Sequence, residues 1–175
     1  MKIDKKKGIL FWVTGLSGAG KTSISNKIYP RIKDRYGKTL YINGDEIRKI
    51  FNIKGYDNTD RKKLSLKYSK LFKKITDQNI NVLFAGMALF DDTRIWNRIN
   101  IKNYLEIFIK TNLKKIIKKN YTKIYKRKTK LVGIDMKAEF PKKPDIIINN
   151  DFNKSIEKLS NELVLKINKK ELWIF

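Results

Sequence analysis

Five short runs along the chain are almost entirely apolar, and longer segments that mix apolar and charged residues separate them. Apolar runs without alternation are typical of strands buried on both faces of a parallel sheet. They predict strands at residues 9–14, 39–42, 81–85, 104–110 and 146–148.

The segments between these runs have the spacing of helices. In the longest of them, Leu64, Tyr68 and Phe72 recur every four residues and would form one apolar face. The segments predict helices at residues 22–33, 45–51, 59–78, 91–99, 113–119 and 155–168. Asp91 suits the start of the fourth helix, and Asn153 is the predicted cap of the last one.

Strands that alternate with helices predict a doubly wound α/β fold. No linker rich in proline or glycine divides the chain, so we expect a single domain spanning residues 1–175. Residues 121–145 are basic and lack periodicity, which is typical of a lid or binding loop in a compact domain.

Composition excludes several kinds of chemistry. The sequence has no cysteine, which excludes disulfides and thiolate chemistry, and no histidine, which excludes histidine bases and histidine-ligated metals. Acid–base steps would therefore fall to carboxylates, lysine, tyrosine or water. No apolar stretch is long enough to span a membrane, and the first apolar run leads straight into a glycine motif as a buried strand would, so we expect a cytoplasmic protein.

The net charge of +24 has two interpretations. It arises mainly from lysine, which A/T-rich codons favour, so a solvated lysine surface is the simpler one. Attraction of polyanions such as nucleotides or nucleic acid is the other. General nucleic-acid binding is the less favoured, because phosphate-binding surfaces more often use arginine.

A glycine motif follows the first predicted strand and opens the first predicted helix. It matches the pattern G-x-x-x-x-G-K-[ST], in which backbone N–H groups and a helix N-terminus surround a polyphosphate. Lys21 would contact the β- and γ-phosphates of ATP, and the Thr22 hydroxyl would bind Mg²⁺. The motif predicts a P-loop NTPase-type three-layer sandwich, with a parallel sheet of about five strands and helices on both faces. Its expected ATP-binding residues are Gly15, Ser17, Gly18, Ala19, Gly20, Lys21, Thr22 and Ser23.

A second polar segment, Asn43 to Arg48, follows the second predicted strand. Carboxyl ends of parallel strands face the same crevice, so Asp45 should lie near the γ-phosphate. There it could accept a proton from an attacking hydroxyl or hold Mg²⁺ through water. Arg48 would lie one helical turn further on and could bind an anionic acceptor. Alternatively, Asp45 simply caps the helix and Arg48 lies on the surface.

Taken together, these motifs resemble the adenylyl-sulfate kinase family over roughly residues 8–150. The resemblance rests on ordered matches: the glycine loop, Gly44-Asp45-x-x-Arg48, Gly55-Tyr56-(x)4-Arg61, Phe90 with Arg94, Tyr125-Lys126, Gly133-Ile134-Asp135 and Pro144-Asp145-Ile146. It implies transfer of the γ-phosphate of MgATP to the ribose 3′-hydroxyl of a small nucleotide. It also implies a homodimer, since members of that family are commonly dimeric.

The resemblance assigns roles residue by residue. Lys21 and Asp45 would be catalytic, and Thr22 and Asp45 would be the magnesium partners. Arg48 and Arg61 would hold the anionic end of the acceptor. The remaining acceptor-side positions are Tyr56, Leu64, Phe90, Lys126, Leu131 and Ile134.

Several of these positions depart from the family pattern. Asn43 replaces an aspartate and Leu64 an asparagine, while Tyr56 and Leu131 replace two phenylalanines that would face adenine. Residues on the ATP side are kept, whereas residues on the acceptor side change. This asymmetry favours a different acceptor, first of all cytidine diphosphoramidate, which a kinase resembling this family phosphorylates for capsule phosphoramidate synthesis. The alternatives are an adenylyl-sulfate kinase and, more remotely, a basic P-loop module that binds nucleotide or RNA.

Overall fold

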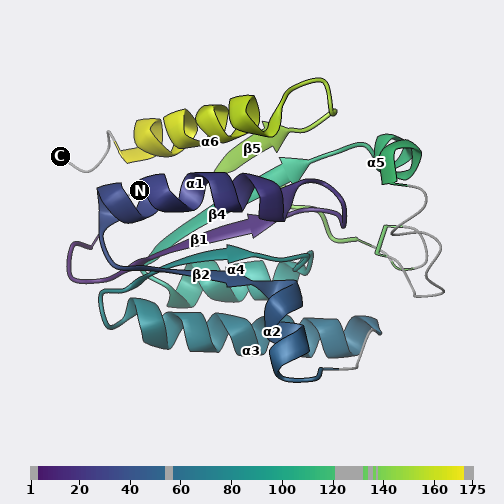
Figure 1. Cartoon of the computed structure of the whole chain (residues 1–175). Coiled ribbons are helices and arrows are strands. Elements are labelled where there is room, and N and C mark those ends of the chain that lie inside the picture. The colour runs from purple at the N-terminus through teal and green to yellow at the C-terminus, as the bar shows by residue number, and fades with distance from the viewer. Residues whose placement is uncertain (1–3, 54–56, 121–131, 134–135, 137, 172–175) are drawn as a thin grey trace.

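The computed structural model describes residues 4–53, 57–120, 132–133, 136 and 138–171. Its centre is a parallel sheet with the strand order β2-β3-β1-β4-β5 (Figure 1). The strands are β1 (Ile9–Thr14), β2 (Thr39–Asn43), β3 (Asn81–Ala85), β4 (Asn103–Lys110) and β5 (Ile146–Asn149). The three inner strands are buried along almost their whole length, as their unbroken apolar runs predict.

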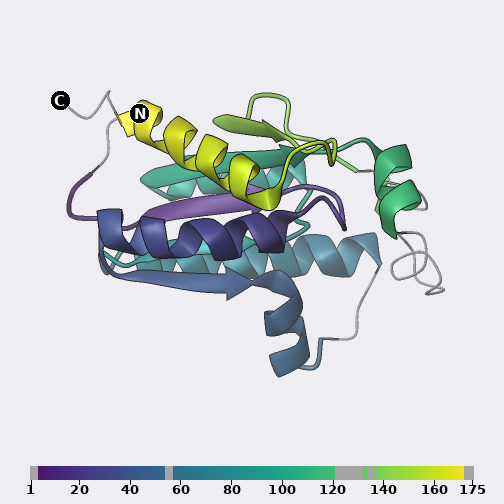
Figure 2. The ribbon, with the colours of Figure 1, turned by 45° about the horizontal axis from the view of Figure 1, so that its top comes forward.

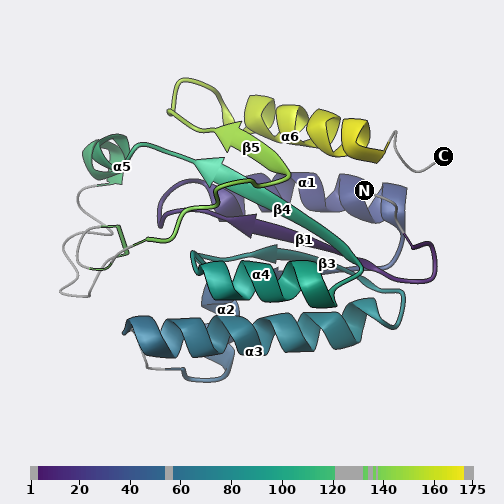
Figure 3. The same ribbon diagram turned by 180° about the vertical axis from the view of Figure 1, so that it is seen from behind.

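Helices cover both faces of this sheet. Figure 2 places α1 (Lys21–Tyr36) beside α6 (Ile156–Glu171) on one face, and Figure 3 places α3 (Asn58–Thr76) beside α4 (Asp91–Asn100) on the other. Two shorter helices, α2 (Gly44–Ile50) and α5 (Leu113–Asn120), lie beyond the carboxyl ends of the strands (Figure 1). The predicted three-layer α/β sandwich is therefore confirmed.

Each face of the sheet has its own apolar core. On the side of α1 and α6, Ile24, Ile28 and Leu163 are fully buried against the sheet. On the side of α3, the Trp12 ring lies 4.5 Å from Phe84 and 6.2 Å from Phe72, measured between ring centroids. This aromatic packing fixes α3 against the sheet.

Two helix starts differ from the sequence prediction or extend it. Ser155, not Asn153, caps α6, because its Oγ accepts a hydrogen bond from the Lys158 N–H at 3.2 Å. The N-terminus of α4 is capped from a distant segment, since Glu139 Oε2 accepts from the Asp91 N–H at 2.5 Å. Glu139 has no sequence signal for this contact, which only the tertiary fold creates.

The strand order places the glycine loop at the middle of the sheet. The chain moves outward from β1 to β2, returns through β3 and then crosses to β4 on the other side. Ligands bind at such a reversal of strand order in open parallel sheets.

Most of the predicted lid at residues 121–145 lies outside the described residues. Its last part returns past the β3–α4 loop, where the Glu139 N–H donates to the Leu89 carbonyl at 3.2 Å. Within the described residues, no helix has the length and apolar character needed to cross a membrane.

Candidate active site

The glycine loop between β1 and α1 has a backbone shape that only glycine tolerates at two points. Gly15 and Gly20 have φ angles of 151° and 92°. A Cβ at Gly15 would lie 2.5 Å from the Ile109 carbonyl oxygen, and one at Gly20 would lie 2.9 Å from Asn150 Nδ2. Asn150 in turn donates from Nδ2 to the Ala19 carbonyl at 2.9 Å, so the residue directly after β5 supports the loop. The loop thus has the tight curvature that surrounds a polyphosphate.

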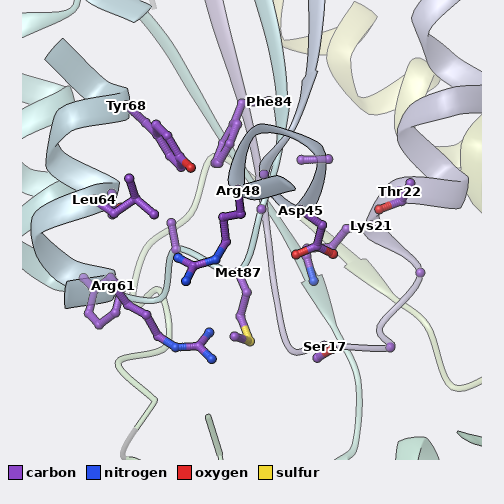
Figure 4. A pocket seen from close by; sticks show the side chains of 18 of the residues that line it. Ser17, Lys21, Thr22, Asp45, Arg48, Arg61, Leu64, Tyr68, Phe84 and Met87 are labelled. Carbon is purple, nitrogen blue, oxygen red and sulfur yellow. The ribbon is translucent and has the colours of Figure 1, made fainter. Parts of the chain in front are cut away.

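A pocket of about 360 Å³ opens beside this loop (Figure 4). It brings together most of the predicted site residues: Ser17, Gly18, Gly20, Lys21, Thr22, Ser23, Asp45, Arg48, Arg61, Leu64 and Phe90. Gly15 and Ala19 belong to the loop but are not among the residues that line the pocket. The predictions for Tyr56, Lys126, Leu131 and Ile134 fall outside the described residues.

Lys21 follows the glycine loop as the first residue of α1. Its Nζ donates to the Leu16 carbonyl at 2.8 Å, and its side chain lies next to Asp45 in Figure 4. Burial lowers the pKa of Lys21 from 10.5 to about 8, and the negative charge of Asp45 partly opposes this shift. An incoming phosphate would add negative charge beside the ammonium group and favour its protonated form.

We expect the affinity for MgATP to decrease as the pH rises through about 8. Lys21 carries its charge below that pKa and loses it above, so the dissociation constant should increase by up to about tenfold per pH unit. Calorimetric titrations between pH 6.5 and 9.5 would measure this. Lys21→Arg, which stays charged throughout, is the control and should give a flat profile. A wild-type affinity that does not change up to pH 9.5 would contradict the expectation.

The turn from β2 into α2 positions Asp45. Asn43 caps α2, because its Oδ1 accepts from the Asp45 N–H at 3.0 Å. The alternative in which Asp45 itself is the cap is therefore wrong. The Asp45 carboxylate lies next to the Lys21 side chain in the pocket (Figure 4). The Asn43 amide also lies 3.5 Å from Thr22 Oγ1. Asn43 thus couples the two segments that would surround the transferred phosphate.

The residues around Thr22 and Asp45 fit a magnesium ion that is carried by ATP. The described residues contain no group of three or more Asp, Glu, His or Cys side chains that could hold a metal ion by themselves. Mg²⁺ in kinases is instead held by substrate phosphates, waters and one or two protein oxygens. The Thr22 hydroxyl and the Asp45 carboxylate, which line the same pocket, are suitable protein oxygens.

Two arginines line the pocket beyond Asp45. Arg48 extends from α2 and donates to the Ile53 carbonyl at 3.3 Å, while Arg61 extends from the first turn of α3. In Figure 4 both guanidinium groups lie across the pocket from Thr22. Guanidinium groups bind phosphate and sulfate oxygens in pairs of hydrogen bonds. One part of the pocket can therefore bind the phosphates of ATP and another can bind a second anion.

Sequence reasoning missed several residues that line the pocket. Ser65 and Tyr68 lie on α3, four and seven residues after Arg61, and therefore share its face. The helical spacing from Arg61 was the available signal for both residues. The apolar spacing of Leu64, Tyr68 and Phe72 instead predicted that Tyr68 belongs to the core. Phe84 and Met87, at and after the end of β3, also line the pocket, and nothing in the sequence distinguishes them from ordinary core residues.

Arg94, which matches the family pattern, does not line the pocket. It is only 4% exposed and pairs with Asp91 and with Glu106, whose Oε1 lies 3.2 Å from Arg94 Nε. Arg98 donates to the other oxygen of Glu106 at 2.7 Å and to Asp145 at 3.2 Å. This network, centred on the buried Glu106, joins α4, β4 and the segment that leads into β5.

Fold and site together define a class of protein: a P-loop kinase, with the glycine loop at the centre of a parallel sheet and a pocket lined by two arginines beside it. Comparison with known proteins identifies the family. A model described as adenylylsulphate kinase matches residues 7–149. The chain belongs to this family of phosphotransferases.

Individual relatives agree with this assignment. The chain is 33% identical over 167 residues to cytidine diphosphoramidate kinase from Campylobacter jejuni subsp. jejuni serotype O:2, covering 93% of this chain and 97% of that protein. It is 25% identical over 166 residues to adenylyl-sulfate kinase from Staphylococcus carnosus, covering 90% and 83%. The solved APS kinase from Mycobacterium tuberculosis, in complex with AMPPNP and APS, has the same fold, with a TM-score of 0.79, 24% identity and coverage of 93% and 98%.

Proposed function

We propose that this kinase transfers the γ-phosphate of MgATP to the ribose 3′-hydroxyl of a small nucleotide that carries an anionic 5′ group. The observation that carries the proposal is the arrangement of one pocket, with Lys21 and Asp45 beside the glycine loop and Arg48 and Arg61 across from it. An acceptor held at its anionic end by the arginines would present its ribose to Asp45.

Each residue of this arrangement has a distinct task. The loop N–H groups and Lys21 hold the β- and γ-phosphates of ATP, which neutralises charge that develops during transfer. Bound Mg²⁺ supplies further charge neutralisation at these phosphates. The Asp45 carboxylate orients the acceptor hydroxyl and accepts its proton as the oxygen attacks phosphorus. Because transfer of a phosphoryl group depends mainly on positioning and charge, the absence of histidine from the sequence is no obstacle.

Cytidine diphosphoramidate is the acceptor that we propose. The Campylobacter jejuni relative bears that name and is 33% identical to this chain, against 25% for the adenylyl-sulfate kinase of Staphylococcus carnosus. The pocket supports a change of acceptor, since Leu64 lines it at a position where the resembled family pattern has an asparagine. Replacement of a polar contact by an apolar one changes which acceptor groups can be satisfied.

Incubation of the purified protein with MgATP and one acceptor at a time tests the proposal. We expect kcat/KM for cytidine diphosphoramidate to exceed that for adenylyl sulfate by at least about tenfold, since one buried hydrogen-bonding difference has that effect or more. ADP release gives the rate, and mass and phosphorus–proton coupling of the product locate the new phosphate at the 3′ position.

The other outcomes are equally informative. Preference for adenylyl sulfate would mean that the substitutions around the pocket leave the acceptor of the wider family unchanged. Turnover of neither acceptor would contradict the nucleotide 3′-kinase proposal and favour a P-loop module that only binds nucleotide or RNA.

We also propose a homodimer, on the basis of family membership alone.

A further inference from the structure

Two buried hydroxyl groups on α3 line the pocket next to its arginines. Ser65 is 3% exposed and Tyr68 is 9% exposed, and both belong to the pocket wall. Neither the Ser65 Oγ nor the Tyr68 hydroxyl has a hydrogen-bond partner among the residues that the structure describes. Buried hydroxyls are nearly always hydrogen-bonded in folded proteins, because burial without a partner is unfavourable. Other buried hydroxyls, those of Ser69 and Tyr104 among them, also lack a partner among the described residues, but of these hydroxyls only those of Ser65 and Tyr68 line the pocket. A ligand in the pocket could therefore supply the missing bonds of these two.

The Tyr68 hydroxyl is held rigidly in this wall. Its ring stacks on Phe72 with centroids 6.1 Å apart and lies 5.9 Å from the ring of Phe84. These rings belong to the aromatic core beneath α3, so the side chain has little freedom to turn away. In Figure 4 the Tyr68 hydroxyl points from the ring toward the pocket. A fixed hydroxyl is better suited to distinguish between ligands than a mobile one.

The hydroxyls share their compartment with positive charge. Arg61, Ser65 and Tyr68 are spaced by four and three residues and so follow one face of α3. Arg48 lies close enough to the Tyr68 phenol to favour its ionised form, but burial outweighs this effect and raises the pKa of Tyr68. The phenol therefore keeps its proton at neutral pH and can both donate and accept a hydrogen bond.

We propose that Ser65 and Tyr68 recognise the terminal phosphoramidate of the acceptor through its amide group. Arg48 and Arg61 can only donate hydrogen bonds, so they suit the anionic oxygens of the diphosphoramidate. An amide nitrogen on phosphorus carries N–H donors, which arginine cannot accept and hydroxyl oxygens can. A terminal phosphate or sulfate lacks these donors. The hydroxyl pair therefore determines selectivity for the amidate, an inference that rests on the proposed function.

Cytidine diphosphoramidate and CDP form the matched pair of acceptors for the test, because they differ only in an amide or an oxygen on the terminal phosphorus. We expect the wild-type protein to prefer the amidate. In Ser65→Ala and in Tyr68→Phe, kcat/KM for the amidate should fall by about 3- to 10-fold, the range of one neutral hydrogen bond. The loss should appear in KM, with kcat nearly unchanged, and kcat/KM for CDP should change by less than about 2-fold.

Two control variants remove buried hydroxyls elsewhere. Ser69 is fully buried on the same helix and Tyr104 is buried on β4, and neither is among the residues that line the pocket. Ser69→Ala and Tyr104→Phe should therefore leave the ratio of the two acceptors unchanged. Thermal unfolding of all four variants verifies that each is folded under the assay conditions.

The outcomes separate this inference from the proposed function. Wild-type turnover of the amidate, combined with an unchanged acceptor ratio in Ser65→Ala and Tyr68→Phe, would overturn the inference alone. Equal losses for the amidate and for CDP would also overturn it, because the hydroxyls would then contact groups that both acceptors share. Failure of the wild-type protein to phosphorylate the amidate would overturn the proposed acceptor and the inference with it.

Discussion

Asp45→Asn should reduce kcat by about 10³-fold, within the range for loss of a positioned general base. The carboxylate faces Lys21 in the pocket and is the acid that lines it among the described residues. Asparagine keeps the size of the side chain but cannot accept the proton of the acceptor hydroxyl. It also removes the negative charge that could contact Mg²⁺. The glycine loop stays intact in this variant, so the affinity for ATP should remain within about threefold of wild type, the change expected when one exposed contact is altered.

Steady-state kinetics and calorimetric ATP titration measure the two quantities separately. Glu46→Gln is the matched control, since Glu46 is the next residue on α2 and is exposed, but is not among the residues that line the pocket. It should retain near wild-type turnover. An Asp45→Asn protein with undiminished kcat would remove Asp45 from the mechanism. A variant that also fails to bind ATP would instead assign Asp45 mainly to magnesium and nucleotide binding.

Glu106→Gln should produce the largest loss of stability among these predictions. Glu106 is 3% exposed and pairs with both Arg94 and Arg98. Removal of its charge takes away the buried carboxylate partner of Arg94, whose other carboxylate partner, Asp91, is partly exposed. Breaking a buried ion pair in this way costs about 3–5 kcal/mol of the free energy of unfolding. For a chain of this size the melting temperature should fall by about 10 °C.

Thermal and urea unfolding measure this loss. Glu157→Gln is the control, because Glu157 also pairs with two cations, Lys27 and Arg31, but on the surface. Solvent screens such exposed pairs, so this change should cost no more than about 1 kcal/mol. Equal stability of the two variants would mean that the buried network contributes no more than a surface ion pair. The network also includes Asp145, which pairs with Arg98.

Local pattern accounts well for the strands. The predicted ranges 9–14 and 81–85 coincide with β1 and β3, and the other three strands are one residue longer at one end. The reason is that strands in the middle of a parallel sheet are buried on both faces and therefore appear as unbroken apolar runs. Helix ends were less predictable. The cap of α6 is a choice between neighbouring polar residues, and that of α4 comes from Glu139, some forty-eight residues away.

The glycine loop is the part of the site that the sequence alone determines. Its glycines, Lys21 and Thr22 are contiguous, and their chemistry depends on the backbone of that one segment. Asp45 and Arg48 were predictable for a related reason, because the carboxyl ends of neighbouring parallel strands share one edge. Although Asp45 and Arg48 are distant from the glycine loop in the sequence, the topology of the parallel sheet is enough to predict that they lie near it.

Only the tertiary structure decides the remainder. In the sequence, Ser65 and Tyr68 are ordinary positions of an amphipathic helix. The packing of α3 beside the end of β3 places them in the wall of the pocket. Arg94 carries a family motif in the sequence, yet packing directs it to Glu106 and away from the pocket. Which side chains are buried and which partners they contact depends on which elements pack together in the fold. A local pattern of residues does not determine that packing. The proposed ATP-phosphate site therefore lies in one contiguous segment of the sequence. The proposed acceptor side of the pocket and the ion-pair network around Glu106 instead arise from the packing of distant segments.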